Sequence, residues 1–205
     1  MRYLCIVGRT DEAQRVLDGG ESVFGPDMKD LLQREIYEAT NNYERALTIV
    51  RRQKKNSVFP GKHAVVESHM LMKLRRYEEA EELARGILVP AHFGPEYDAL
   101  IINLELSCQR QGRKVDKARL GKILERNSPN DAVSLCALLL LDEKSKATEP
   151  LLAIVEKDRT EIYQIGRWAI LDIPGNSAWF AATLKSRGFD TAVVAVASKK
   201  IAAAE

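Results

Sequence analysis

The side chains most able to do chemistry in this chain are its histidines, and their spacing decides what they could do. His63 and His69 could bind a metal ion, but they are six positions apart and so do not share a helix face at ligand spacing. His92 lies in a proline-bounded loop, where we expect it to be solvated. We therefore expect no metal site.

A cluster of four carboxylates could also do chemistry, as metal ligands or as a general acid and base. The cluster comprises Glu78, Glu79, Glu81 and Glu82. These residues begin an expected helix, where carboxylates are favoured by the helix dipole and by neighbouring lysine and arginine. We interpret the cluster as a solvated helix face. Since no phosphate-binding glycine loop and no nucleophile–base pair is evident in the sequence, we expect no catalytic residue, no cofactor and no enzymatic activity.

Cysteine usage and the length of the apolar runs indicate the compartment. Cys5, Cys108 and Cys136 lie far apart and have neither metal-ligand nor redox spacing. We interpret them as small buried hydrophobic residues in a reducing environment. The most apolar run, residues 132–141, is about half the length that a membrane-spanning helix needs. We therefore expect a soluble, cytoplasmic protein without a membrane partner, and we expect this run to be a helix buried on most sides.

Composition is that of a folded soluble protein. The chain has 205 residues, of which 45% are hydrophobic and 29% are charged. Glycine and proline are sparse, which favours helices over an all-β fold. The formal net charge of +2 is too small to indicate nucleic-acid binding by itself.

A repeat with a period near 34 residues runs through the chain. Tyr43 and Ala46 recur as Tyr77 and Ala80, 34 positions later. Two weaker copies of the repeat, at Ala13 and Ala118, keep the alanine and lack the aromatic residue. The aromatic side chain can pack back onto the preceding helix, and the alanine suits an inner face where two backbones approach closely.

These residues resemble the second-helix signature of the tetratricopeptide repeat, whose period is also 34 residues. The resemblance covers about residues 9–130 and departs from the family at Arg34, where glycine or alanine is usual, and in lacking the family's Trp and Leu-Gly positions. It implies an all-α fold, a right-handed α-α superhelix of antiparallel helix pairs. We expect residues 1–205 to form one solenoid domain, with divergent helix pairs and a cap in residues 131–205.

Periodicity of 3.6 and helix stop signals predict the individual helices. We expect them near 10–18, 27–40, 42–54, 62–75, 77–88, 95–110, 115–126, 130–142, 147–157, 160–171, 176–186 and 190–203. Pro26 or Asp27 can open the second of these helices. We place Pro129 at the start of one later helix and Pro150 in the first turn of another, where a missing N–H costs nothing.

Basic residues gather at two expected turns within helix pairs. They are Lys73, Arg75 and Arg76 in the first turn and Arg110, Arg113 and Lys114 in the second. Residues 34–126 contain 18 Lys and Arg against 13 Asp and Glu. One interpretation is ordinary, because cations are favoured at helix C-termini. The other is a surface for an anionic partner, with both turns on one edge of the solenoid and the basic segment 51–55 on the opposite edge.

The N-terminal face is expected to be incomplete. Residues 1–9 are too few for a full helix that covers the helix around Ala13, so Val16 and Leu17 should be partly exposed. Because each solenoid repeat buries its apolar face only against its neighbours, we expect this end to contact a second copy, a partner or a further domain.

Three functions are therefore compared. The first is a scaffold, adaptor or chaperone-type module that holds a peptide, helix or subunit of another protein. The alternative is a nucleic-acid-associated helical repeat that binds through the basic turns. An enzyme with a helical active site ranks last, because no catalytic group emerges. The identity of the partner does not follow from the sequence, since a fold alone does not supply a function.

Overall fold

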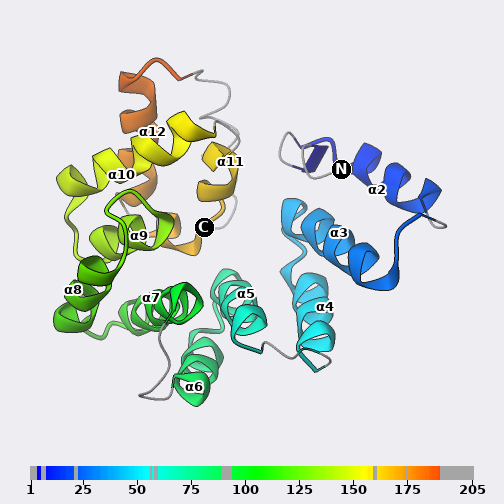
Figure 1. The fold of residues 1–205 in the computed structure, drawn as a ribbon, viewed down its shortest axis with the longest axis horizontal. Helices are drawn as coiled ribbons and strands as arrows, with labels where there is room; N and C mark the ends of the chain where they lie inside the picture. Colours follow the sequence, from blue (N-terminus) through cyan, green and yellow to red (C-terminus); the bar gives the residue numbers. More distant parts are fainter. Residues whose placement is uncertain are drawn as a thin grey trace. The chain divides into compact units, whose positions relative to one another are not determined.

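In the computed structural model, every element of regular structure among the described residues is helical (Figure 1). The structure describes residues 4–5, 8–20, 23–55, 57, 60–88, 94–158, 161–173 and 175–189. The chain divides into two compact units, which meet in sequence between Ile87 and Leu88. Each unit is described by itself. The helix expected at 190–203 lies outside the described residues.

The first unit is a series of helices in which each one packs against the next. These helices are α2 (Thr10–Gly19), α3 (Pro26–Ala39), α4 (Tyr43–Lys55), α5 (Pro60–Lys73) and α6 (Tyr77–Ile87). Residues 4–5 are helical as well. Turns of three residues join α3 to α4 and α5 to α6, as antiparallel neighbours require. Pro26 is the first residue of α3, as expected.

The second unit is arranged around α9. Its elements are α7 (Pro95–Arg110), α8 (Lys117–Arg126), α9 (Ala132–Leu140), α10 (Lys144–Lys157), α11 (Glu161–Ile165), the 3-10 helix η1 (Ala169–Asp172) and α12 (Asn176–Ser186). Helix α9 contacts α7, α8, α10 and η1, and most of its side chains are buried. The expectation of a helix buried on most sides is thus confirmed. Helix α12 packs on η1 and α10.

One turn geometry recurs within the helix pairs. In each of these pairs, one residue of the connecting turn has a left-handed backbone conformation. The N–H of the next residue donates a hydrogen bond to the backbone carbonyl of the third residue from the end of the first helix. The left-handed residues are Asn41, Arg75, Gly112 and Asp142. The N–H···O distances are 2.8 Å (Asn42 to Tyr37), 2.9 Å (Arg76 to Leu71), 3.0 Å (Arg113 to Cys108) and 2.9 Å (Glu143 to Leu138). The repeat seen in the sequence therefore corresponds to a repeated turn.

Three of the four predicted repeat alanines occupy the expected inner position. Ala13, Ala46 and Ala80 are each the fourth residue of a helix and are each 0% exposed. A further alanine at this position, Ala147 of α10, is also 0% exposed, although the sequence pattern did not single it out. Ala147 lies 67 positions after Ala80, close to two repeat periods, but no alanine stands at the intermediate position, where Arg113 and Lys114 occur.

The assignment of Ala118 as a repeat alanine is wrong. Ala118 is the second residue of α8 and is exposed. Three residues, Arg113 to Val115, separate the left-handed Gly112 from Asp116, the residue that caps α8. This insertion shifts the start of α8, so that Leu120 is the fourth residue and is 0% exposed.

Two expectations about the starts of helices are also wrong. Helix α10 begins at Lys144, so Pro150 lies in its interior instead of its first turn. Helix α9 begins at Ala132 with the Asp131 carboxylate accepting the Ser134 N–H at 2.7 Å, so Pro129 precedes it.

The helix expected at 160–171 ends at Ile165 and gives way to η1. Trp168 is extended between the two elements, with a ψ of 134°. The buried amide of Asn176 donates to the Ile170 carbonyl at 3.0 Å and holds η1 in place. A contact from α12, which local periodicity does not report, therefore stabilises the segment that follows the break.

Candidate functional site

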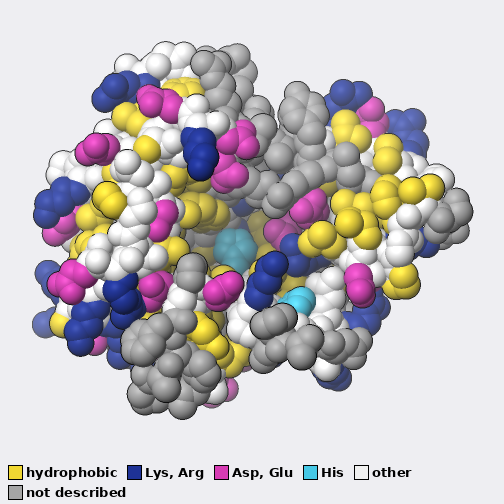
Figure 2. All heavy atoms as spheres, in the orientation of Figure 1, with side chains coloured by type: hydrophobic (Ala, Val, Ile, Leu, Met, Phe, Trp, Pro, Cys, Tyr) yellow, Lys and Arg dark blue, Asp and Glu magenta, His cyan; other side chains and the backbone are white. Residues whose placement is uncertain are grey.

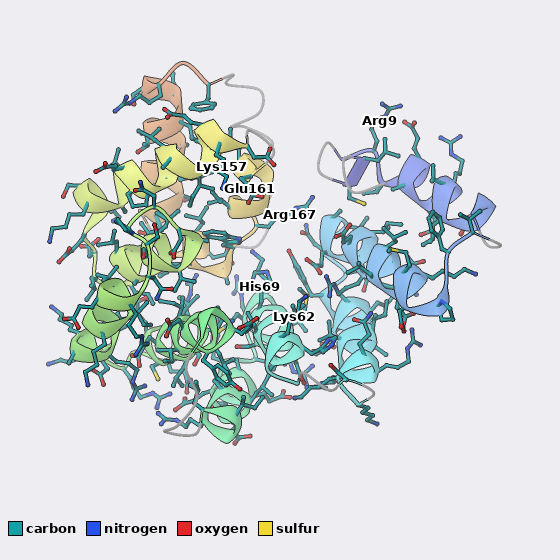
Figure 3. All side chains as sticks on the ribbon, viewed as in Figure 1. Arg9, Lys62, His69, Lys157, Glu161 and Arg167 are labelled. Atoms are coloured by element: carbon teal, nitrogen blue, oxygen red, sulfur yellow. The ribbon has the colours of Figure 1, made fainter. Side chains whose placement is uncertain are left out.

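The two histidines of α5 are held as neutral imidazoles. Figure 3 labels His69 and Lys62, which both come from α5. Burial, with the positive charges of Lys73 and Arg34, lowers the pKa of His69 to about 3. Burial also lowers the pKa of His63, as do the neighbouring cations Arg34 and Lys62. Both side chains are therefore uncharged at neutral pH.

Metal-ligating and thiol groups are not assembled in the part of the chain that the structure describes. Within the described ranges, no three or more His, Cys, Asp or Glu side chains are grouped to hold a metal ion. His92 lies outside these ranges. Cys5 and Cys108 are buried thiols, as expected. Burial, and then the charge of Asp131, raises the pKa of Cys136 to about 12, which keeps this thiol protonated.

The acidic cluster of α6 divides into exposed and ion-paired side chains. Glu78 and Glu82 are exposed, as expected for a solvated helix face. Glu79 accepts two hydrogen bonds from Arg76, at 2.5 and 2.7 Å. The hydrogen bond from Arg76 lowers the pKa of Glu79. Glu81 pairs with Arg85 at 2.9 Å.

A buried carboxylate joins α4 to α5. Glu67 accepts hydrogen bonds from Arg51 Nε and Lys54 Nζ, both at 2.8 Å. Burial alone would raise the pKa of Glu67, but the hydrogen bonds from Lys54 and Arg51 outweigh it and lower the pKa. The basic end of α4 is thus bound within the first unit. Sequence reasoning missed Glu67, because one acidic residue in a helix gives no sign of its burial.

The basic turn between α5 and α6 also makes contacts inside the first unit. Lys73 Nζ lies 5.9 Å from the centre of the Tyr43 ring. Arg75 is exposed and has a left-handed φ of 59°. Arg76 pairs with Glu79 and, at 3.3 Å, with Glu44. These carboxylates offset much of the positive charge that the sequence places at this turn.

The basic turn between α7 and α8 is built differently. Arg113 and Lys114 are exposed there, and Arg110 ends α7. The nearby carboxylates are committed to the fold. Asp116 accepts the Arg119 N–H at 3.0 Å and so caps α8, and buried Glu105 accepts the Asp116 N–H at 2.7 Å. The two basic turns belong to different units, so their placement on one edge stays a prediction.

An apolar surface lies at the turn between α2 and α3. Among the described residues, the large hydrophobic side chains that are exposed are Val16 (46%), Val23 (78%) and Met28 (47%). They lie in the last turn of α2, in the connecting loop and in the first turn of α3. Figure 2 shows hydrophobic side chains gathered over these two helices.

The predicted exposure at this end is confirmed for Val16 and wrong for Leu17. Leu17 is only 6% exposed and belongs to a core cluster that includes Cys5 and Ile36. Leu4 packs against the same cluster. Leu4 and Cys5 therefore help to cover the inner side of α2.

Helices long and apolar enough to cross a bilayer do not occur among the described ones. Comparison with known proteins gives no family, since no family model, no curated protein and no solved structure matches this chain.

Proposed function

We propose that this protein is a binding module that holds a segment of another protein, as a scaffold, an adaptor or a chaperone does. The observation that carries the proposal is the apolar surface formed by Val16, Val23 and Met28. Large apolar side chains that stay exposed and gather at one turn are characteristic of interaction sites, whereas single exposed ones are ordinary. The proposed partner therefore presents an apolar segment to the α2–α3 turn.

The finer architecture in this proposal is a right-handed solenoid like that of tetratricopeptide proteins. It is supported by the recurrent left-handed turn and by the buried alanines at the fourth helix position. In such a stack, each repeat buries its apolar face only against its neighbours. The exposed side chains of the α2–α3 turn lie outside the buried contacts of this stack, where a partner could pack on them.

The surroundings of the apolar surface favour a protein as its occupant. Arg15, Asp18 and Asp27 are exposed close to it in sequence and carry charges of both signs. An apolar centre with a polar rim is the usual anatomy of a protein–protein interface. A lipid or a nucleic acid would instead favour one sign of charge around the site.

The experiment compares the unmodified chain with a variant that carries Val16→Glu and Val23→Glu. Partners are captured from an extract of the native host by cross-linking, identified by mass spectrometry and then purified for binding measurements. The control variant carries Thr48→Glu and Gly86→Glu, two exposed positions on α4 and α6 that change the net charge equally. We expect the apolar-surface variant to weaken binding of the purified partner by about tenfold or more, because each change removes an apolar anchor.

Two results would count against the proposal. A partner retained equally by both variants would bind elsewhere on the chain. Sedimentation that shows a concentration-dependent dimer, lost in the apolar-surface variant, would assign this surface to a second copy of the chain.

A further inference from the structure

Positive charge is concentrated in one short stretch of the second unit. Residues 110–126 contain seven Lys and Arg against two Asp and Glu. The remainder of residues 88–205 contains nine Lys and Arg against thirteen Asp and Glu. Figure 2 shows dark blue Lys and Arg side chains gathered over α8. The unit therefore has little net charge but a pronounced charge asymmetry.

The turn that begins this stretch is longer than the equivalent turns. In the α3–α4, α5–α6 and α9–α10 pairs, a single residue separates the left-handed residue from the next helix. Between Gly112 and α8 there are four, so the turn has three additional residues, of which Arg113 and Lys114 are exposed cations. The extra residues are anchored at both ends, by the Arg113 N–H on Cys108 and by the Asp116 N–H on Glu105.

Some of the cations in this stretch are used by the fold. Arg119 pairs with buried Glu105 at 2.8 Å, and Arg126 pairs with buried Asp98. The other five Lys and Arg residues of this stretch define what we term the basic surface, and four of them are exposed. They are Arg110, Arg113, Lys114, Lys117 and Lys122, against Asp116 and Glu125.

We infer that the basic surface binds the phosphate backbone of a nucleic acid without reading its sequence. Phosphate contacts require only positioned cations and backbone donors. A protein interface is usually centred on an aromatic or other large apolar anchor, and a membrane-surface helix needs an apolar face. Among the described residues of the second unit, neither a large hydrophobic nor an aromatic side chain is exposed. The same observation argues against stacking on bases.

This inference is separate from the proposed function. The protein partner is assigned to the α2–α3 turn of the first unit, whereas the nucleic acid is assigned to the α7–α8 turn of the second. Either assignment can fail while the other stands.

The test measures binding of the full chain to fluorescently labelled single-stranded RNA and duplex DNA of mixed sequence. Probes of about 30 nucleotides are titrated by anisotropy at several salt concentrations, because each phosphate contact contributes about −0.7 to −0.9 to the slope of log K against log salt. We expect binding at low salt that weakens steeply as salt is added. A peptide nucleic acid of the same sequence, which has no phosphates, should not bind.

The decisive variant reverses three exposed charges of the basic surface, with Lys114→Glu, Lys117→Glu and Lys122→Glu. Its matched control carries Lys146→Glu, Lys157→Glu and Lys185→Glu, at exposed positions elsewhere in the same unit, and has the same net charge. We expect about a tenfold or greater loss of affinity for the first variant, with a salt slope reduced by about one per cation, and little change for the control. A neutral variant with glutamine at positions 114, 117 and 122 repeats the test should the glutamates disturb folding.

Four outcomes would overturn the inference. The first is that the unmodified chain binds neither probe at low salt, and the second is that the two charge variants lose affinity equally. The third is that the peptide nucleic acid binds as tightly as RNA, and the fourth is that polyglutamate competes as well as RNA. The last of these would indicate an acidic protein as the partner.

Discussion

At the scale of single residues, the fourth position of the second helix in a pair is buried in each of the described pairs. Ala46, Ala80 and Ala147 are fully buried there, and so is the larger Leu120 of α8. The position therefore accepts different sizes in different pairs, provided that the surrounding side chains leave the corresponding space. Because each site is packed around its own residue, replacing that residue with a larger one should lower the free energy of unfolding.

Replacing Ala80 with leucine should destabilise the protein by about 1–3 kcal/mol, because three additional carbon atoms must enter a close-packed contact. The free energy of unfolding in urea measures the effect. Ala118→Leu is the matched control, since Ala118 is exposed in the first turn of α8 and the change should stay within about 0.5 kcal/mol. Equal effects of the two substitutions would contradict the repeat register described for α6 and α8.

The left-handed turn residue gives a second prediction at this scale. Gly112→Ala should destabilise the protein by about 1 kcal/mol, because a β-carbon is unfavourable at a φ of +75° although nothing lies within 4 Å of it. The same change at Gly121, inside α8 and equally free of neighbours, should stabilise by about 0.5–1 kcal/mol through helix propensity. Urea unfolding should therefore show opposite signs for one chemical change, and a stabilising Gly112→Ala would exclude the turn conformation.

At the scale of helices, the first and last residues of most helices could be predicted from the sequence. The periodicity of hydrophobic residues and the residues that start or stop a helix are both local features of the sequence. The predicted ranges 95–110 and 176–186 coincide with α7 and α12. Two of the failures involve contacts from another helix or inserted residues. Asn176 stabilises the break after α11, and the insertion after Gly112 displaces the start of α8.

The candidate surfaces were only partly predictable for the same reason. The sequence indicated the cations of the two basic turns and the exposure of Val16. It did not indicate the buried carboxylates Glu67 and Glu105, whose partners come from another helix. Which partner a charged residue has depends on tertiary packing. The structure is therefore needed to tell which cations form ion pairs with buried carboxylates.

Helix α5 should make the stability of the protein sensitive to mild acid. His69 is neutral in the folded protein, with a pKa of about 3, whereas an unfolded histidine accepts a proton near pH 6.5. Because the unfolded state binds the additional proton, stability is complete above about pH 6.5 and falls as the pH decreases, by up to about 1.4 kcal/mol per pH unit.

Urea unfolding between pH 7 and pH 5 measures this dependence. His69→Gln should reduce the slope by about one proton, since glutamine does not titrate. The ordinary carboxylates titrate mainly below this interval, so they contribute little to the difference. An unchanged slope in the variant would mean that His69 is protonated in the folded protein.

At the scale of the whole molecule, the division between Ile87 and Leu88 concerns how the chain unfolds and where its partners bind. The two candidate surfaces fall in different units: the apolar one in the first and the basic one in the second. If each unit is a separate cooperative unit, a change in one can alter its own surface while the other surface keeps its structure.

Leu135→Ala tests this separation. Leu135 is fully buried in α9, the helix around which the second unit is arranged, so the substitution should destabilise that unit by about 2–5 kcal/mol. Hydrogen exchange followed along the chain should show faster exchange of the most protected amides in α7–α10, with those of α3–α6 unchanged. Thr48→Ala is the control, because its exposed side chain contributes little to packing. Equal loss of protection in both sets of helices would show that the two units unfold together, because a single cooperative transition transmits the destabilisation to every helix.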